Sequence, residues 1–211
     1  MPRIDFHYGK EFSSADIYLW HIEEDCDILS RLIGDNGMHL AESIRRFKSE
    51  KRRREWLATR ALLQQTPYKD TEIRYHDNGQ PHTGDSGKQI SISHTRGYAA
   101  IALSETPIGI DIETEERNAL AVADAFMQPR EKELLMACAA PASEALRLWT
   151  VKEAAFKLAP QHSQVLKDIH ATAEGNGFYS IIYKDGTTAT CHTTEHCGII
   201  VSCAQYNSHT N

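Results

Sequence analysis

The chain is organised around residues 109–113, which read Gly-Ile-Asp-Ile-Glu. Apolar and acidic residues alternate here with a period of two. This pattern predicts a β-strand in which Asp111 and Glu113 point to one face and the isoleucines to the other. Two carboxylates on one strand face repel each other unless a cation lies between them, and Mg²⁺ typically takes one or two carboxylates together with substrate phosphates. The alternatives at this point are a metal site and a solvated edge of a sheet.

Length and composition indicate an ordinary globular protein. The 211 residues are 41% hydrophobic and 25% charged, which suits one large domain or two small halves. No apolar run approaches the roughly 20 residues of a membrane span, and the N-terminal residues lack the apolar core of a signal peptide. We therefore expect a cytoplasmic protein with no membrane partner. The five cysteines form no CxxC pair, and we expect them to be reduced.

Charge is unevenly distributed along the chain, whose formal net charge is −6. Residues 45–54 contain seven basic residues and one acidic residue, so the rest of the chain holds 16 basic residues against 28 acidic ones. A basic patch on an acidic protein indicates a localised anion site, and a solvated helix face is the alternative. The acidic balance and the lack of a recognised binding motif argue against nucleic acid as a partner.

Hydrophobic periodicity and capping residues predict the secondary structure. A helix over 26–33 is expected to end at Gly34, and a second helix is expected to begin at Ser49. A third helix is expected over 144–158 and should end before Pro160. Turns are expected at residues 36–37, 77–81 and 185–186, and strands over residues 17–22, 89–93, 98–103, 109–113, 178–183, 187–192 and 197–205.

Three of these strands follow one another between residues 89 and 113. Their short connections suggest an antiparallel meander. In such a sheet His94 would lie near Asp111 and Glu113. The alternative for His94 is a structural role at the end of a strand.

Two groups of residues in the second half of the chain are of types that often occur in catalytic or metal sites. Trp149, Glu153 and Lys157 are four residues apart, so they share one row on the surface of a helix. The alternative is an exposed Glu–Lys pair beside a packing tryptophan. The segment 191–197 contains two cysteines and two histidines. On a strand, however, the cysteines and the histidines face opposite sides, so we do not expect a zinc site there.

Three blocks of the chain resemble the 4′-phosphopantetheinyl transferases, specifically the larger type that activates peptide and polyketide synthases. Residues 92–95 read Ile-Ser-His-Thr, residues 109–113 match the metal-binding block, and residues 149–157 follow the pattern W-x-x-K-E-A-x-x-K. The resemblance extends over about residues 45–158, and it has weaker support from Arg54, Arg60, Gly79, Pro81, Phe126 and Glu131.

The resemblance implies an α+β fold of two pseudo-symmetric α/β halves, each a small antiparallel sheet packed with helices. The halves are expected at residues 1–105 and 106–211 of one monomer, with the active-site cleft between them. It also implies transfer of the 4′-phosphopantetheine arm from coenzyme A to a serine of an apo acyl or peptidyl carrier protein. The reaction would depend on Mg²⁺, with Mn²⁺ as an alternative ion, and would release adenosine 3′,5′-bisphosphate.

The resemblance also implies roles for individual residues. Asp111, Glu113 and Glu153 would hold the metal ion, and Glu153, Lys157 and Asp111 would be catalytic, with Glu153 as the base for the serine. Coenzyme A would contact Arg45, Arg46, Arg53, Arg54, Gly79, Gln80, Pro81, Ser93, His94, Lys152 and Lys157.

The chain departs from the family pattern in three places. Gln80 stands where the family often has a lysine, so one phosphate contact is expected to come from elsewhere. The lysines that some members place before the basic helix are absent, which leaves the 3′-phosphate to residues 45–54 or to His94. Residues 158–162 replace a glycine-rich turn that is expected at the carrier-facing edge. Two other functions use similar residues, namely a metal-dependent phosphohydrolase acting on a nucleotide-like pyrophosphate and a non-catalytic module that binds carrier proteins.

Overall fold

Contacts within the chain divide it into two units, Met1–Glu105 and Thr106–Asn211. The computed structural model describes residues 3–6, 15–34, 43–69, 71–84 and 87–207. The turn expected at residues 36–37 lies outside these ranges. Every helix in the described ranges is too short or too polar to cross a membrane.

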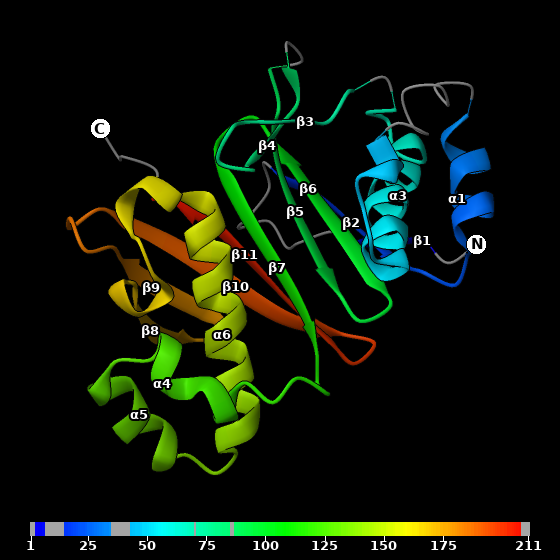
Figure 1. Ribbon diagram of the computed structural model, residues 1–211. Helices are drawn as coiled ribbons and strands as arrows, with labels where there is room; N and C mark the ends of the chain where they lie inside the picture. Colours follow the sequence, from blue (N-terminus) through cyan, green and yellow to red (C-terminus); the bar gives the residue numbers. More distant parts are fainter. Residues whose placement is uncertain (1–2, 7–14, 35–42, 70, 85–86, 208–211) are drawn as a thin grey trace. The chain divides into compact units, whose positions relative to one another are not determined.

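The N-terminal unit is built on a four-stranded sheet in the order β1-β2-β6-β5 (Figure 1). All neighbouring strands in it are antiparallel. Helix α3 packs on strands β2 and β6, and helix α1 packs on α3. A separate hairpin is formed by β3 and β4. The bounds of these elements are β1 Arg3–Phe6, β2 Ala15–His21, α1 Cys26–Ile33, α3 Glu50–Gln64, β3 Arg74–Tyr75, β4 Pro81–His82, β5 Gln89–Thr95 and β6 Tyr98–Ser104.

Helix α1 ends at the predicted Gly34, and helix α3 begins at the predicted Ser49. The side chain of Asp25 accepts a hydrogen bond from the backbone of Ile28 at the start of α1, and Gly34 follows its last residue with a φ of +83°. Ser49 caps α3 by accepting from the backbone of Arg52. The apolar face of α3 is fully buried in the core of the unit, and it includes Leu57, Ala58, Ala61 and Leu62.

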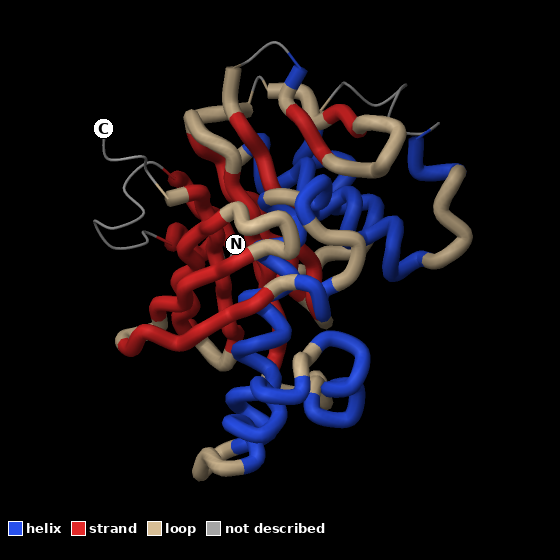
Figure 2. The backbone as a smooth tube through the Cα atoms, turned by 90° about the vertical axis from the view of Figure 1, so that its left-hand side faces the viewer, coloured by secondary structure: helices blue, strands red, loops and turns tan. Residues whose placement is uncertain are grey.

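The C-terminal unit is built on a five-stranded antiparallel sheet in the order β7-β11-β10-β9-β8. Helix α6 lies across one face of this sheet, and α4 and α5 pack against α6 (Figure 1). Figure 2 shows the same strands in red and the helices in blue. The bounds are β7 Ile108–Thr114, α4 Ala123–Phe126, α5 Pro129–Met136, α6 Pro141–Leu158, β8 His170–Gly175, β9 Phe178–Ile182, β10 Thr188–His196 and β11 Ile199–Tyr206, with short 3₁₀ turns at Leu120–Val122, Pro160–His162 and Leu166–Asp168.

The two units repeat one topology. In each, the strand that precedes the long helix pairs with the last strand, which in turn pairs with the strand before it. This gives β2-β6-β5 in the first unit and β7-β11-β10 in the second. The long helix, α3 or α6, packs on the sheet of its own unit. The predicted α+β class with two pseudo-symmetric halves is therefore confirmed.

The predicted meander is wrong. Strands β5 and β6 do form an antiparallel pair, but β7 pairs with β11 instead of β6. Both edges of β6 are already occupied, by β2 and by β5, so no edge is left for β7. His94 and Asp111 consequently lie in different sheets, and the meander gives no reason to place them together. The exposed strand β8 was not predicted, because its residues lack an apolar alternation.

A close contact between β7 and α6 depends on Gly109. A Cβ atom at this position would lie 2.0 Å from the carbonyl oxygen of Ala154 and 2.6 Å from the backbone nitrogen of Leu158. We expect Gly109→Ala to force the helix away from the strand and to lower the free energy of unfolding by about 3 kcal/mol. Urea denaturation measures this loss. An unchanged midpoint would show that the contact relaxes without cost.

Candidate active site

Three predicted carboxylates come together between β7 and α6. Asp111 and Glu113 lie on the face of β7 that Gly109 turns towards α6, and they are only 6% and 8% exposed. Glu153 lies on α6, where burial and then the negative charge of Asp111 raise its pKa, with a smaller contribution from Glu113. Strand β7 is the edge strand of its sheet, but the side chains of Asp111 and Glu113 are buried and not solvated.

Two cations hold these carboxylates. The Nζ of Lys157 donates to Oδ1 of Asp111 at 2.7 Å and to the carbonyl oxygen of Ile110 at 3.1 Å. Arg117 forms an ion pair of 2.8 Å with Glu113. Sequence reasoning missed Arg117, which follows the end of β7. Its spacing of four from Glu113 is an ion-pair signal on a helix, but here it spans the end of a strand and a turn.

The donor set suits a hard divalent cation in its chemistry. Asp111, Glu113 and Glu153 supply carboxylate oxygens, which are the ligands that Mg²⁺ prefers. Within the described ranges, however, no group of three or more His, Cys, Asp or Glu side chains is already arranged around a metal position.

Lys152 does not join this cluster. Its side chain is fully buried, and its Nζ donates to the carbonyl oxygen of Phe126 at 2.8 Å and to Oε2 of Glu131 at 2.6 Å. Burial lowers the pKa of Lys152, and the hydrogen bond and charge of Glu131 oppose this shift. The prediction that Lys152 contacts coenzyme A is therefore corrected. Lys152 is adjacent to Glu153 in α6 and therefore points in a different direction, which places its side chain in the core.

Trp149 packs against the hydrophobic cluster that contains Phe126 of α4 and Ile200 of β11. Its ring lies edge-on to Phe126, with the ring centroids 5.0 Å apart. The guanidinium of Arg117 lies over the same ring, 4.1 Å from its centroid. The row of Trp149, Glu153 and Lys157 thus connects the helix packing to the carboxylate cluster.

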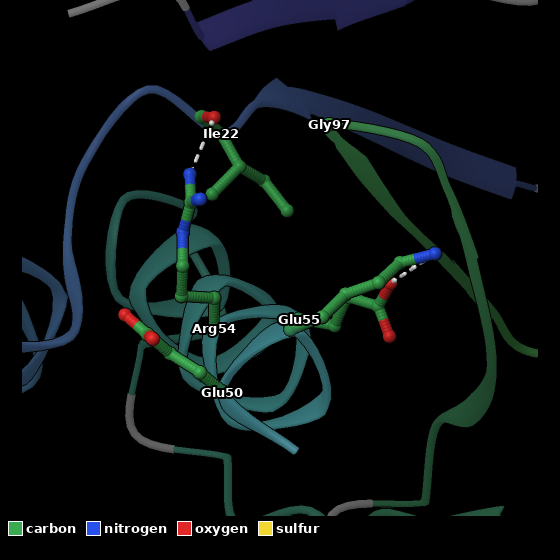
Figure 3. A pocket seen from close by; sticks show the side chains of 6 residues that line it. Ile22, Glu50, Arg54, Glu55 and Gly97 are labelled. Carbon is green, nitrogen blue, oxygen red and sulfur yellow. Dashed lines mark hydrogen bonds and ion pairs between the residues drawn. The ribbon is translucent and has the colours of Figure 1, made fainter.

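In the N-terminal unit, Arg54 is tied to the backbone. Its Nε and Nη2 donate to the carbonyl oxygens of Glu24 and Ile22, both at 3.1 Å. It lines a pocket of about 280 Å³, which Figure 3 shows. The pocket walls include two carboxylates as well as two cations, so the pocket has no marked preference for an anion. Its lining consists of Ile22, Glu50, Lys51, Arg54, Glu55 and Gly97.

Arg46 and Arg60 form a more suitable anion site. Both guanidinium groups lie over the ring of Trp56, at 5.9 Å and 3.3 Å from its centroid. Burial lowers the pKa of Arg60, Tyr75 opposes this shift, and the charge of Arg46 adds to it. Neither arginine has a carboxylate partner within the described residues. Arg60 was only weak support for the resemblance, and its role was missed because a single arginine in a helix carries no pattern.

The other predicted coenzyme A residues are spread over the N-terminal unit. Arg45 is exposed, and Arg53 donates to the carbonyl oxygen of Phe47 at 3.2 Å. Ser93 is buried on β5, and the next residue, His94, shares a hydrogen bond of 2.8 Å with Thr59 of α3. The remaining three, Gly79, Gln80 and Pro81, form the end of the β3–β4 turn, in which Gly79 has a φ of +84°.

Comparisons with known proteins give one family match and a distant structural likeness. Residues 107–204 match the family model described as the 4′-phosphopantetheinyl transferase superfamily. No curated protein gives a significant match. Among solved structures, the chain is similar to Thermotoga maritima holo-[acyl-carrier-protein] synthase, with 22% sequence identity and a TM-score of 0.42. The match covers 49% of this chain and only 64% of that one, a likeness too remote to carry an argument.

Proposed function

We propose, from the premise that residues 107–204 place the chain in the 4′-phosphopantetheinyl transferase superfamily, that the protein transfers the 4′-phosphopantetheine arm of coenzyme A. The acceptor is a serine of an apo acyl or peptidyl carrier protein, and the second product is adenosine 3′,5′-bisphosphate. The observation that carries the proposal is the cluster of Asp111, Glu113, Glu153 and Lys157 between β7 and α6, which lies inside the matched region.

Glu153 is the proposed base. A serine hydroxyl becomes a good nucleophile only when its proton is removed. Burial and the neighbouring carboxylates raise the pKa of Glu153, which makes it a stronger proton acceptor than an ordinary glutamate. The serine oxygen then forms a bond to the β-phosphorus of coenzyme A, and the bond from this phosphorus to the adenosine bisphosphate breaks, so the leaving group departs with the electron pair.

Charge neutralisation is the second requirement of this reaction. Lys157, whose Nζ lies 2.7 Å from Asp111, is placed to neutralise phosphate oxygens. A bound Mg²⁺, held by Asp111, Glu113 and Glu153, would supply Lewis-acid polarisation of the pyrophosphate. Preorganised charges of this kind commonly contribute about 3 kcal/mol each to the transition state. The monomeric state, the cytoplasmic location and a cleft between the halves stay predictions.

For the adenosine 3′-phosphate we propose Arg46 and Arg60. Two guanidinium groups without a carboxylate partner suit a phosphate, because their planar forks can bind it with two hydrogen bonds each. Coenzyme A should therefore bind about tenfold more tightly than dephospho-coenzyme A. This difference should shrink in Arg46→Gln and persist in the control Arg31→Gln, which removes an exposed arginine of α1 in the same unit. Calorimetric titration of both ligands measures it, and equal affinity of the wild-type protein for the two would contradict the assignment.

The test of the proposed function is product analysis. The protein is incubated with coenzyme A and Mg²⁺, with and without an apo-carrier protein, and the nucleotides are separated by chromatography. Release of adenosine 3′,5′-bisphosphate only in the presence of the carrier is the expected result. Release without a carrier would identify a phosphohydrolase instead, and binding of the carrier without any release would identify a non-catalytic binding module.

A further inference from the structure

We propose that Arg117 is an internal counter-ion of the carboxylate cluster, which holds Glu113 in the metal-free protein and is displaced when a divalent metal ion binds. The inference rests on the proposed function, because it takes Asp111, Glu113 and Glu153 as the metal ligands. It goes beyond that function by assigning to Arg117 the control of metal affinity.

The first argument is the contact between Arg117 and Glu113. The guanidinium lies 2.8 Å from Oε1 of Glu113, and the carboxylate side chain is only 11% exposed. Mg²⁺ binds its oxygen ligands at about 2.0–2.1 Å. A guanidinium and a divalent ion on the same buried carboxylate would be two positive charges within a few ångströms of each other, where they repel. The ion pair with Arg117 therefore competes with metal binding at Glu113.

The second argument concerns the surroundings that can accept the Arg117 guanidinium once it leaves Glu113. Its guanidinium already lies over the ring of Trp149, 4.1 Å from the centroid, so a cation–π contact can keep it close after it leaves Glu113. Arg117 also borders a cavity of about 520 Å³, whose walls include the carboxylates of Glu115 and Glu116. Its own side chain is 38% exposed. The guanidinium can therefore move within this cavity, stay over the Trp149 ring, or approach the carboxylates of Glu115 and Glu116.

The third argument is the contrast with Lys157. Lys157 is on α6, within the row that contains Glu153, and it also donates to the backbone of Ile110. Arg117 lies outside that helix, and within the described residues its guanidinium makes no hydrogen bond to the backbone. Of the two cations, Lys157 is thus the one with the additional backbone hydrogen bond.

The experiment measures metal binding directly, without coenzyme A or a carrier. MgCl₂ is titrated into the full-length protein by calorimetry, and MnCl₂ binding is followed by electron paramagnetic resonance. We expect Arg117→Met to bind both ions about three- to tenfold more tightly than wild type, because the competing ion pair is removed. Arg147→Met is the matched control. It removes an arginine from the ion pair of Arg147 with Glu195, which is 3.0 Å long and lies in the same unit, and its metal affinity should equal that of wild type.

The outcomes separate this inference from the proposed function. Wild-type binding of the ions with no tightening in Arg117→Met would overturn the counter-ion role and leave the metal site intact. Absence of binding in wild type at millimolar concentration would overturn both. If Arg117→Met does not fold, as judged by its circular dichroism, Arg117→Lys is measured instead. This variant keeps the charge but loses the planar fork, so it should bind metal more tightly than wild type, and equal or weaker binding would overturn the inference.

Discussion

Glu153→Gln is expected to lower the transfer rate by at least about 100-fold, while the Kd for coenzyme A changes by less than about threefold. The amide keeps the size of the side chain but cannot accept the proton of the serine. Binding of coenzyme A should suffer little, because Lys157 and the two stacked arginines remain. Single-turnover kinetics at saturating Mg²⁺ and calorimetry with coenzyme A measure the two effects separately. Glu195→Gln, which removes a carboxylate from a surface ion pair, is the control and should react at the wild-type rate.

The pH dependence of the same step follows from the raised pKa of Glu153. A base works only when it is deprotonated, so the transfer rate should fall as the pH falls through this raised pKa. A bound Mg²⁺ would favour the ionised carboxylate and oppose this shift, so the acidic limb of the profile should move to lower pH as the Mg²⁺ concentration rises. Near-normal turnover of Glu153→Gln would show that this carboxylate is only part of an ion-pair cluster and that another group is the base.

Glu131→Gln is expected to lower the free energy of unfolding by about 3–5 kcal/mol, because it leaves a buried ammonium group without its counter-ion. Lys152 is fully buried and lies 2.6 Å from Glu131. The carboxylate of Glu131 also accepts from the backbone of Gln128 at 2.8 Å and of Ala171 at 3.3 Å. It therefore ties α6 to the start of α5 and to β8. Urea denaturation at neutral pH measures the loss.

A double variant distinguishes the buried charge from the loss of packing. Replacement of both partners of a buried pair is often close to neutral, so Lys152→Met combined with Glu131→Gln should recover most of the stability that the single variant loses. If the single variant unfolds at the wild-type urea concentration, the pair is not desolvated, and its role as the tie between these elements is wrong.

The elements that sequence analysis predicted correctly depend on local signals. Gly34 follows α1, Ser49 caps α3, and Pro160 follows the end of α6, because a helix terminus needs partners for its unpaired backbone groups. The alternation over 109–113 likewise required no knowledge of the fold. It predicted that two carboxylates share a face, and the row on α6 predicted that Glu153 and Lys157 share another.

The features that sequence analysis missed depend on contacts between distant segments. β7 pairs with β11, which begins at Ile199, and no local pattern favours this partner over β6. The burial of Lys152 depends on Glu131 and Phe126, 21 and 26 residues earlier. The burial of the Lys152 side chain could not be deduced from its place on α6. The packing of α4 and α5 determines which side of that helix is covered.

The most direct test of the central claim is the intact mass of an apo-carrier protein after incubation with this protein, coenzyme A and Mg²⁺. Wild type should increase the mass of the carrier by one phosphopantetheine arm, and peptide mapping should place the arm on a serine. The same carrier with this serine replaced by alanine should stay unmodified, and Glu153→Gln should leave the wild-type carrier in its apo form over the same time. A panel of apo-carriers from fatty-acid, polyketide and peptide synthases that all keep their original mass with wild-type protein would contradict the account.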